Sequence, residues 1–274
     1  VHGYLPETDP IEVVSPSGVC CAGMHAFKYA YLAVKSGEVD TAVSAGSERF
    51  STALRADQFQ DEVQKLIALE ENPYIAFEKD FLRWMLSDGA GALLLSNKMN
   101  ETGLNLRVEW LEGVSYANEM EACMFMGAEK KPDGTLTSYM DYNPEELKTK
   151  SVLSIKQDVK LLSEYIVPLG GRKLKEIFDR RGMKSEEIDH FLPHMSSEFF
   201  KSKIYERLIE LGIGIPYDKW RINLDRKGNV GAGSIYLMID ELFHSGMLKK
   251  GDKILLLVPE SSRFSYMYGL MTVC

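Results

Sequence analysis

A cysteine with a helix predicted directly after it is the first group in this sequence that could carry chemistry. Cys21 lies in the segment SGVCCAG, between a turn signal and that helix. A thiol in the first turn of a helix is exposed to the positive end of the helix dipole and to unpaired N–H groups, which lower its pKa and favour the thiolate. Ala22 and Gly23 leave space for a substrate. An arbitrary cysteine is more often buried and inert, and that interpretation suits the neighbouring Cys20.

Two polar side chains in the second half could act with this thiol. His194 directly follows the predicted strand IDHFLP, and active-site side chains of α/β proteins collect at strand ends. Asn229 lies in RKGNVGAGS, whose glycines permit tight turns and close helix packing. Each residue alone has a structural interpretation, as a buried histidine and a turn-forming asparagine. The glycine-rich segment is not a phosphate-binding loop, because it lacks the GxxxxGK[ST] pattern.

Together the three residue types favour thioester chemistry. A thiolate accepts an acyl group and forms a thioester. A histidine and an asparagine that both donate hydrogen bonds to one thioester carbonyl stabilise an enolate. Such an enolate forms when a malonyl group loses CO₂, and it attacks the acyl-cysteine. No side chain has to remove a proton in this scheme.

The composition is that of an ordinary globular protein. The chain has 274 residues, of which 45% are hydrophobic and 26% charged, and this excludes collagen-like, low-complexity and disulfide-dense classes. A net charge of −8 argues against a global attraction to nucleic acid or to an anionic membrane. No apolar run approaches the length of a membrane span, and the first residues do not resemble a signal peptide. The four cysteines and five histidines show no metal-binding spacing, so we expect no metal and a reducing, cytoplasmic location.

The hydrophobic pattern predicts alternating strands and helices in both halves of the chain. In the first half we expect strands over 11–15, 40–46 and 89–96, a helix over 21–35 that ends at Gly37, helix within 51–83, a strand over 106–116 beside 89–96, and a mobile connection over 117–150. In the second half we expect helices over 151–182, 196–211 and 232–243, strands over 188–193, 253–258 and 264–273, and a loop over 223–230.

These motifs resemble the β-ketoacyl-ACP synthase III branch of the thiolase superfamily, and they follow the family's order along the chain. CAG at 21–23 resembles the nucleophile motif, PH at 193–194 the histidine motif, and LDRKGNVGAGS at 224–234 the asparagine motif, which is the most specific. SDGAGA at 87–92 and KSGEVDTAVSAGSE at 35–48 also resemble family segments. The resemblance covers nearly the whole chain and is weakest over 51–83 and 117–150.

The resemblance implies a thiolase-like layered αβαβα fold of class α/β, with two pseudo-equivalent halves at 1–150 and 151–274, and a homodimer. It implies that Cys21 carries the acyl group while His194 and Asn229 activate a malonyl thioester. The backbone N–H groups of Cys21 and Ser262 would form the oxyanion hole. The substrates would be CoA or phosphopantetheine thioesters, brought as acyl-CoA or by an acyl carrier protein, with no permanently bound cofactor and no nucleic acid or membrane partner.

Several positions depart from the family pattern. Phe199 stands where the family often has an arginine near the CoA entrance, Met195 where a glutamine often follows the histidine, and SSRF at 261–264 where the family is glycine-rich. These departures favour carrier-bound or longer acyl chains in a specialised pathway over acetyl-CoA priming. The nucleophile lies only 21 residues from the first residue, so the sequence is interpreted as a piece of a longer synthase whose first half is incomplete.

Other functions stay open at this point. The same fold could transfer an acyl group to a hydroxyl or amine without decarboxylation, against which Asn229 argues mildly. An incomplete chain could be an inactive fragment with a structural or dimerisation role. A Cys–His hydrolase would need an acid or amide that orients the histidine, and the sequence does not place one. Methionines in 117–127 suit either a flexible acyl pocket or an ordinary core: Met120, Met124 and Met126.

Overall fold

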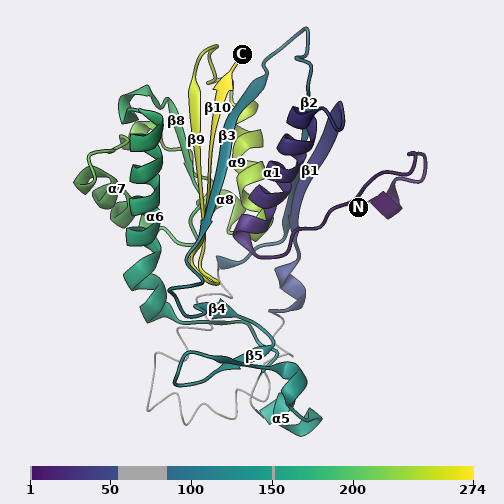
Figure 1. Ribbon diagram of the computed structural model, residues 1–274, viewed down its shortest axis with the longest axis vertical. Coiled ribbons are helices and arrows are strands. Elements are labelled where there is room, and N and C mark those ends of the chain that lie inside the picture. Colours follow the sequence, from purple (N-terminus) through teal and green to yellow (C-terminus); the bar gives the residue numbers. More distant parts are fainter. Residues whose placement is uncertain (1, 55–84, 150–151) are drawn as a thin grey trace.

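A four-stranded sheet forms the centre of the molecule (Figure 1). The computed structural model describes residues 2–54, 85–149 and 152–274. The order of the central strands is β3 (Leu106–Ser115), β10 (Ser265–Val273), β9 (Lys253–Glu260) and β8 (His190–Pro193). Strands β9 and β10 form an antiparallel hairpin, β3 runs antiparallel to β10, and β8 runs parallel to β9.

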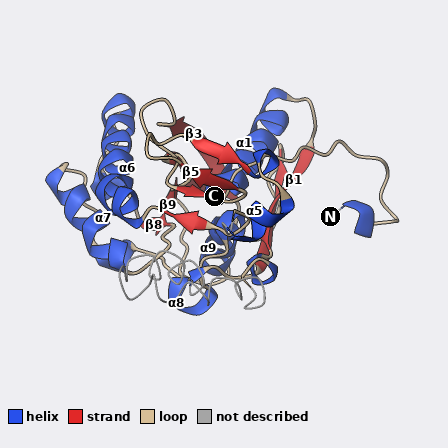
Figure 2. Ribbon diagram, turned by 90° about the horizontal axis from the view of Figure 1, so that it is seen from below, coloured by secondary structure: helices blue, strands red, loops and turns tan. Residues whose placement is uncertain are grey.

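Helices cover both faces of this sheet (Figures 1 and 2). On one face lie α6 (Val159–Arg181) and α7 (Phe199–Glu210), and on the other lie α1 (Cys20–Ser36) and α9 (Ser234–Phe243). An antiparallel pair, β1 (Thr41–Glu48) with β2 (Gly89–Ser96), packs on the far side of α1 and α9. The described residues therefore form four successive layers, α/β/α/β, and confirm the layered α/β class.

The apolar run at 254–258 is buried because both faces of β9 are covered. Side chains alternate along a strand, so Leu255 and Leu257 pack in the cluster with α6 and α7. Leu256 and Val258 pack in the cluster with α1 and α9. A strand buried on both faces is apolar at every position, which is the pattern visible in the sequence.

A close backbone contact joins α1, β1 and the start of α9. A β-carbon at either Gly23 or Gly46 would overlap the carbonyl oxygen of Ala232, so both positions need glycine. The Tyr236 hydroxyl donates a hydrogen bond to the Gly23 carbonyl (2.8 Å), and it therefore accepts one from Ser44 Oγ (2.5 Å). These contacts fix the beginning of α1 against the loop that precedes α9.

Short elements complete the described chain. The region below the central sheet in Figure 1 contains β4 (Met124–Phe125), β5 (Ala128–Lys130), β6 (Leu136–Ser138), α5 (Pro144–Thr149) and β7 (Lys156–Gln157). Helix α8 (Leu224–Lys227) precedes the Asn229 loop, and the remaining helical turns are 3₁₀ segments: His2–Tyr4, Phe50–Thr52, Tyr139–Asp141, Ser185–Glu187, Tyr217–Lys219 and Gly231–Gly233. Among the described residues, no helix is both long enough and apolar enough to cross a membrane.

Most long elements match the sequence prediction, and the differences have physical causes. The predicted strand over 11–15 is wrong, because this exposed segment has no partner strand. The predicted pairing of 106–116 with 89–96 is also wrong, because β3 crosses to the central sheet, where Trp110 and Leu111 are buried. The segment 223–230 contains α8 rather than only loop, and 117–150 contains short strands. The helix predicted within 51–83 lies almost entirely outside the described residues.

The predicted division at residue 150 stays a prediction. Hydrogen bonds between β3 and β10 cross that position, and so does the packing of α1 against α9. Both segments thus contribute residues to each of the two hydrophobic clusters.

Replacing Gly46 with alanine should lower the free energy of unfolding by about 2–3 kcal/mol, because the added methyl group displaces a backbone carbonyl rather than a flexible side chain. Urea unfolding followed by circular dichroism measures this change. Gly3 has open space around it, so Gly3→Ala should change stability by no more than about 0.5 kcal/mol. Equal effects of the two substitutions would contradict the role given to the contact with Ala232.

Candidate active site

The segments that carry Cys21 and His194 both attach to the end of β9. The Cys21 thiol donates a hydrogen bond to the Val258 carbonyl, with Sγ 3.3 Å from the oxygen. The His194 backbone N–H donates a hydrogen bond of 2.8 Å to the carbonyl of Leu257, which precedes Val258 in β9. Two consecutive residues of one strand therefore hold the start of α1 and the residue after β8.

The Asn229 loop lies close to both the cysteine helix and His194. Ala232, three residues after Asn229, is the residue that contacts Gly23 of α1. A small cavity is lined by His194 together with Gly228 and Ser234, which flank Asn229 on both sides. The structure thus brings the three predicted segments together, although they lie far apart in the sequence.

The environment of Asn229 leaves its amide nitrogen free to donate. The side chain is buried, and its Oδ1 accepts a hydrogen bond from the Gly231 N–H at 2.9 Å. This contact fixes which end of the amide is the oxygen. The backbone of Asn229 is paired with residues 85–87, through Met85 and Ser87. Within the described part of the chain, no hydrogen-bond acceptor is found for Nδ2, so this group keeps its capacity to donate.

A buried carboxylate that the sequence analysis missed lies at the start of α1. Glu260, the last residue of β9, is only 5% exposed. Its Oε2 accepts hydrogen bonds from the backbone N–H groups of Cys21 (2.8 Å) and Val19 (2.9 Å). Its Oε1 accepts one from the Ser262 hydroxyl (2.6 Å). An acidic residue that ends a wholly apolar strand was the available signal, since acids are rarely buried without partners.

The electrostatics at Cys21 differ from the sequence-based expectation. Burial raises the pKa of the Cys21 thiol well above its ordinary value, and the nearby Glu260 carboxylate raises it further. The prediction of a lowered pKa is therefore wrong, because the thiol is buried and because the helix-terminal N–H group is occupied by an anion. Burial and the same carboxylate also raise the pKa of Cys20. Burial likewise raises the pKa of Glu48, whose Oε1 accepts the Ala232 N–H at 3.1 Å.

The turn between β9 and β10 is strained at Phe264. This residue is fully buried and has φ of +52°, and it is the one non-glycine residue with positive φ in the described chain. The left-handed region is energetically unfavourable for a residue with a bulky side chain, but not for glycine. The backbone of SSRF thus keeps a left-handed position without a glycine, and this turn holds Ser262 beside Glu260.

Burial keeps His194 neutral. The residue is 4% exposed, and burial lowers its pKa to about 4. A neutral imidazole has one ring N–H donor and one ring nitrogen acceptor. At neutral pH, His194 can therefore donate one hydrogen bond without carrying a charge.

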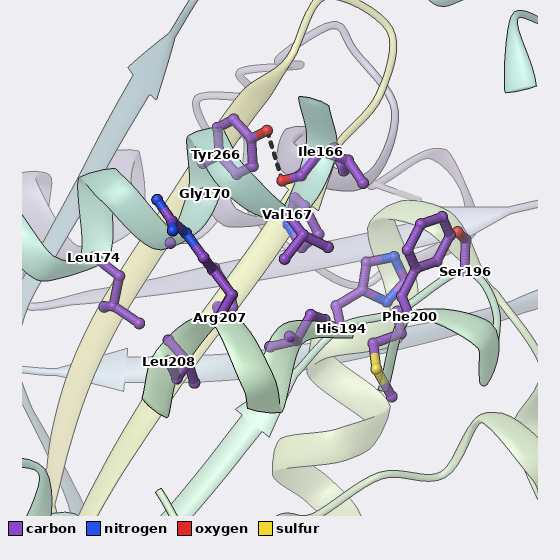
Figure 3. Close-up of a pocket in the computed structure, with 15 residues that line it drawn as sticks. Ile166, Val167, Gly170, Leu174, His194, Ser196, Phe200, Arg207, Leu208 and Tyr266 are labelled. Carbon is purple, nitrogen blue, oxygen red and sulfur yellow. Dashed lines mark hydrogen bonds between the residues drawn. The ribbon is translucent and has the colours of Figure 1, made fainter. Parts of the chain in front are cut away.

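An apolar cavity of about 50 Å³ lies beside His194, between α6 and α7 (Figure 3). Leu257 and Pro259 face it from β9, whereas Cys21 lies on the other face of that strand. The lining residues are Ile166, Val167, Gly170, Gly171, Leu174, His194, Met195, Ser196, Phe200, Ile204, Arg207, Leu208, Leu257, Pro259 and Tyr266. Met120, Met124 and Met126 are not among them, so these methionines do not line this cavity. No cluster suited to a metal ion occurs among the described residues.

Residues 178–258 match the family described as 3-oxoacyl-[acyl-carrier-protein] synthase III, C-terminal. Over 88% of the chain, the sequence is 25% identical to the β-ketoacyl-[acyl-carrier-protein] synthase III of Clostridium perfringens, and the match covers 62% of that relative. The structure is similar to that of OleA from Xanthomonas campestris, with a TM-score of 0.70 and 17% identity over 98% of this chain and 67% of the other. It is also similar to the synthase III of Aquifex aeolicus VF5, with a TM-score of 0.63 and 19% identity over 93% and 65% of the two chains.

The chain is thus similar in sequence to synthase III proteins, and it has a thiolase-like fold. It spans about three fifths of the length of the Clostridium perfringens relative. The matched family segment contains His194 and Asn229, and Cys21 lies outside it. Of the two departures beside His194, Met195 is buried and lines the cavity, whereas the Phe199 side chain is 56% exposed.

Replacing His194 should change how stability depends on pH. In the unfolded chain a histidine binds its proton below about pH 6.5, whereas folded His194 stays neutral down to about pH 4. The unfolded state binds more protons in this window, so His194 makes the protein roughly 3 kcal/mol less stable at pH 4 than at pH 7. Urea unfolding across this range should show a smaller loss for His194→Gln. Equal losses in the two proteins would contradict the neutral, buried histidine.

Proposed function

We propose that this chain carries the acyl-transfer centre of a 3-oxoacyl-ACP synthase III-like acyltransferase. Cys21 Sγ attacks the carbonyl carbon of an acyl thioester, and the CoA or phosphopantetheine thiolate leaves and takes up the proton. A malonyl thioester then loses CO₂, and the electron pair of the broken C–C bond forms an enolate. The enolate carbon attacks the acyl-cysteine, and the Cys21 thiolate leaves. The observation that supports this proposal is that the segments of Cys21 and His194 attach to consecutive residues of β9, while the Asn229 loop packs against the cysteine helix and shares a small cavity with His194.

The protonation of the two polar residues supports their assignment as donors to the malonyl thioester carbonyl. Burial keeps His194 neutral, with one ring N–H to donate. The contact from the Gly231 N–H to Asn229 Oδ1 uses the oxygen of the amide and leaves its nitrogen as the donor. Two uncharged donors can stabilise an enolate oxygen, and neither needs to give up its proton.

The remaining parts of the proposal concern substrates and partners. The apolar lining beside His194 suits the hydrocarbon part of an acyl or pantetheine group. We assign the acyl donor to acyl-CoA or to an acyl carrier protein, the assembly to a homodimer, and the pathway to fatty-acid or specialised, polyketide-like biosynthesis. At about 50 Å³ the cavity offers space for part of an acyl or pantetheine group.

A second candidate function is acyl transfer to a hydroxyl or amine without decarboxylation. The observation that favours it is the acidic surroundings of the nucleophile, since the charged groups that act on the two adjacent cysteines are Glu260 and Glu48. A malonyl carboxylate brought to this place would be repelled by both groups. A neutral hydroxyl or amine acceptor would not be repelled by these carboxylates.

Incubation with acyl-CoA should add one acyl mass to Cys21, and Cys21→Ala should abolish that addition. Intact-protein and peptide mass spectrometry measure it. The matched control is Cys20→Ala, which removes the adjacent thiol and should leave acylation in place. Acylation that persists in Cys21→Ala would contradict the assignment of the nucleophile.

Carboxyl-labelled malonyl thioester separates the two candidate functions. Release of labelled CO₂ that depends on the acyl-enzyme supports condensation. An acyl-enzyme that is consumed by an alcohol or amine without CO₂ release supports the second function. A wild-type chain that never becomes acylated would contradict both.

A further inference from the structure

Both residues predicted to form the oxyanion hole donate a hydrogen bond to the chain's own carboxylate: Cys21 through the predicted backbone N–H, and Ser262 through its hydroxyl instead of its backbone N–H. The Cys21 N–H donates to Glu260 Oε2 at 2.8 Å, and the Ser262 hydroxyl donates to Glu260 Oε1 at 2.6 Å. The Val19 N–H adds a third hydrogen bond at 2.9 Å. Hydrogen bonds to an ionised acceptor are about twice as strong as neutral ones. The Cys21 donor of the predicted oxyanion hole is therefore occupied by an internal anion.

The position of Glu260 excludes a second acceptor at the same amide. A peptide N–H has one proton, and a thioester carbonyl needs a donor about 2.7–3.1 Å away to be polarised. The carboxylate oxygen already occupies that distance from the Cys21 nitrogen. An acyl carbonyl can use this donor only after the carboxylate has moved.

The charge of Glu260 also acts on the thiol. The titratable groups that interact electrostatically with Cys21 are Cys20 on the same helix, Glu260 on β9, and Tyr266 and Tyr268 on β10. Glu48 on β1 acts on the neighbouring Cys20. None of these groups is basic. The thiol is thus held protonated, as its hydrogen bond to the Val258 carbonyl requires.

The surroundings hold Glu260 by hydrogen bonds that a competing group can replace. Among the described residues Glu260 has no ion-pair partner, and its partners are two amides and one hydroxyl. Gly18, with φ of +141°, lies alongside, and a β-carbon there would come within 3.4 Å of Oε2. A β-carbon at Gly18 would thus lie at van der Waals distance from the carboxylate, and the positive φ favours glycine at this position.

We propose that Glu260 is a specificity-determining residue, an internal competitor that occupies the anion-binding donors at Cys21 and must be displaced before an acyl group is loaded. This residue discriminates against thioesters whose binding energy elsewhere is too small to displace the carboxylate. The consequence for catalysis rests on the proposed function. The consequence for thiol reactivity does not.

The decisive measurement is the rate of Cys21 alkylation by iodoacetamide as a function of pH. Glu260→Gln keeps the shape of the side chain and an acceptor for the amide, but it removes the negative charge. Because the thiolate is the reactive form, the rate of Cys21 alkylation at pH 7.5 should rise at least tenfold, and the pH profile should move down by at least one unit. Peptide mass spectrometry assigns each modified cysteine.

Buried Cys123 is the internal reference for unfolding, because global opening would expose both thiols. The quantity compared is the ratio of Cys21 to Cys123 alkylation. Glu187→Gln is the matched control, since this exposed acid pairs with Lys253 at the other end of β9. A ratio and pH profile in Glu260→Gln equal to those of the wild type would overturn the proposal.

Acylation by short and long acyl-CoAs tests the catalytic consequence. Glu260→Gln should raise the acylation rate most for the shortest acyl group. The ratio of the long-chain rate to the short-chain rate should therefore be smaller in this variant than in the wild type. An equal effect on all chain lengths would overturn the assignment of specificity. If alkylation responds as expected and no variant is ever acylated, the proposed function fails and the effect of Glu260 on the thiol stands.

Discussion

The contact between two glycines and one carbonyl oxygen determines where everything else in this site lies. Gly23 on α1 and Gly46 on β1 approach Ala232 so closely that no side chain fits at either position. Tyr236 ties the same three elements together by hydrogen bonds to Gly23 and Ser44. Because Ala232 follows Asn229 by three residues, this packing sets the distance between the cysteine helix and the asparagine loop. The site is therefore a product of backbone packing across the core.

The end of β9 is the second feature that positions the site, and its two faces differ in polarity. Leu257 and Pro259 face the apolar cavity next to His194, whereas Glu260 faces the start of α1. Strand alternation alone requires this division. The carbonyls of Leu257 and Val258 bind the two predicted active-site segments, so a shift of β9 by one residue would exchange the two faces and separate Cys21 from its carboxylate.

The sequence predicted the elements whose signals are local and strong. The helix that ends at Gly37, the strands at 40–46 and 89–96, and the apolar β9 all follow from periodicity and from turn residues. The partner of β3 was not predictable in this way, because an antiparallel strand can pair with its neighbour in sequence or with a distant one, and the burial of Trp110 and Leu111 decides for β10. The segments around Cys21, His194 and Asn229 were predicted from their motifs, and the structure brings them together. Glu260 was missed because its role depends on which helix terminus lies against the end of β9.

The pKa of Cys21 was predicted wrongly because the N–H groups at the start of α1 bind Glu260 instead of acting on the thiol. A helix N-terminus lowers the pKa of a thiol when its N–H groups point at sulfur or at water. Here the Glu260 carboxylate binds the amides of Val19 and Cys21, neutralises the positive end of the helix, and adds a negative charge beside the sulfur. Burial, the larger cause, raises the pKa of the thiol in the same direction. The thiol at rest is consequently the inert form of a nucleophile, and any acyl transfer at this site has to begin by changing the position or the charge of one carboxylate.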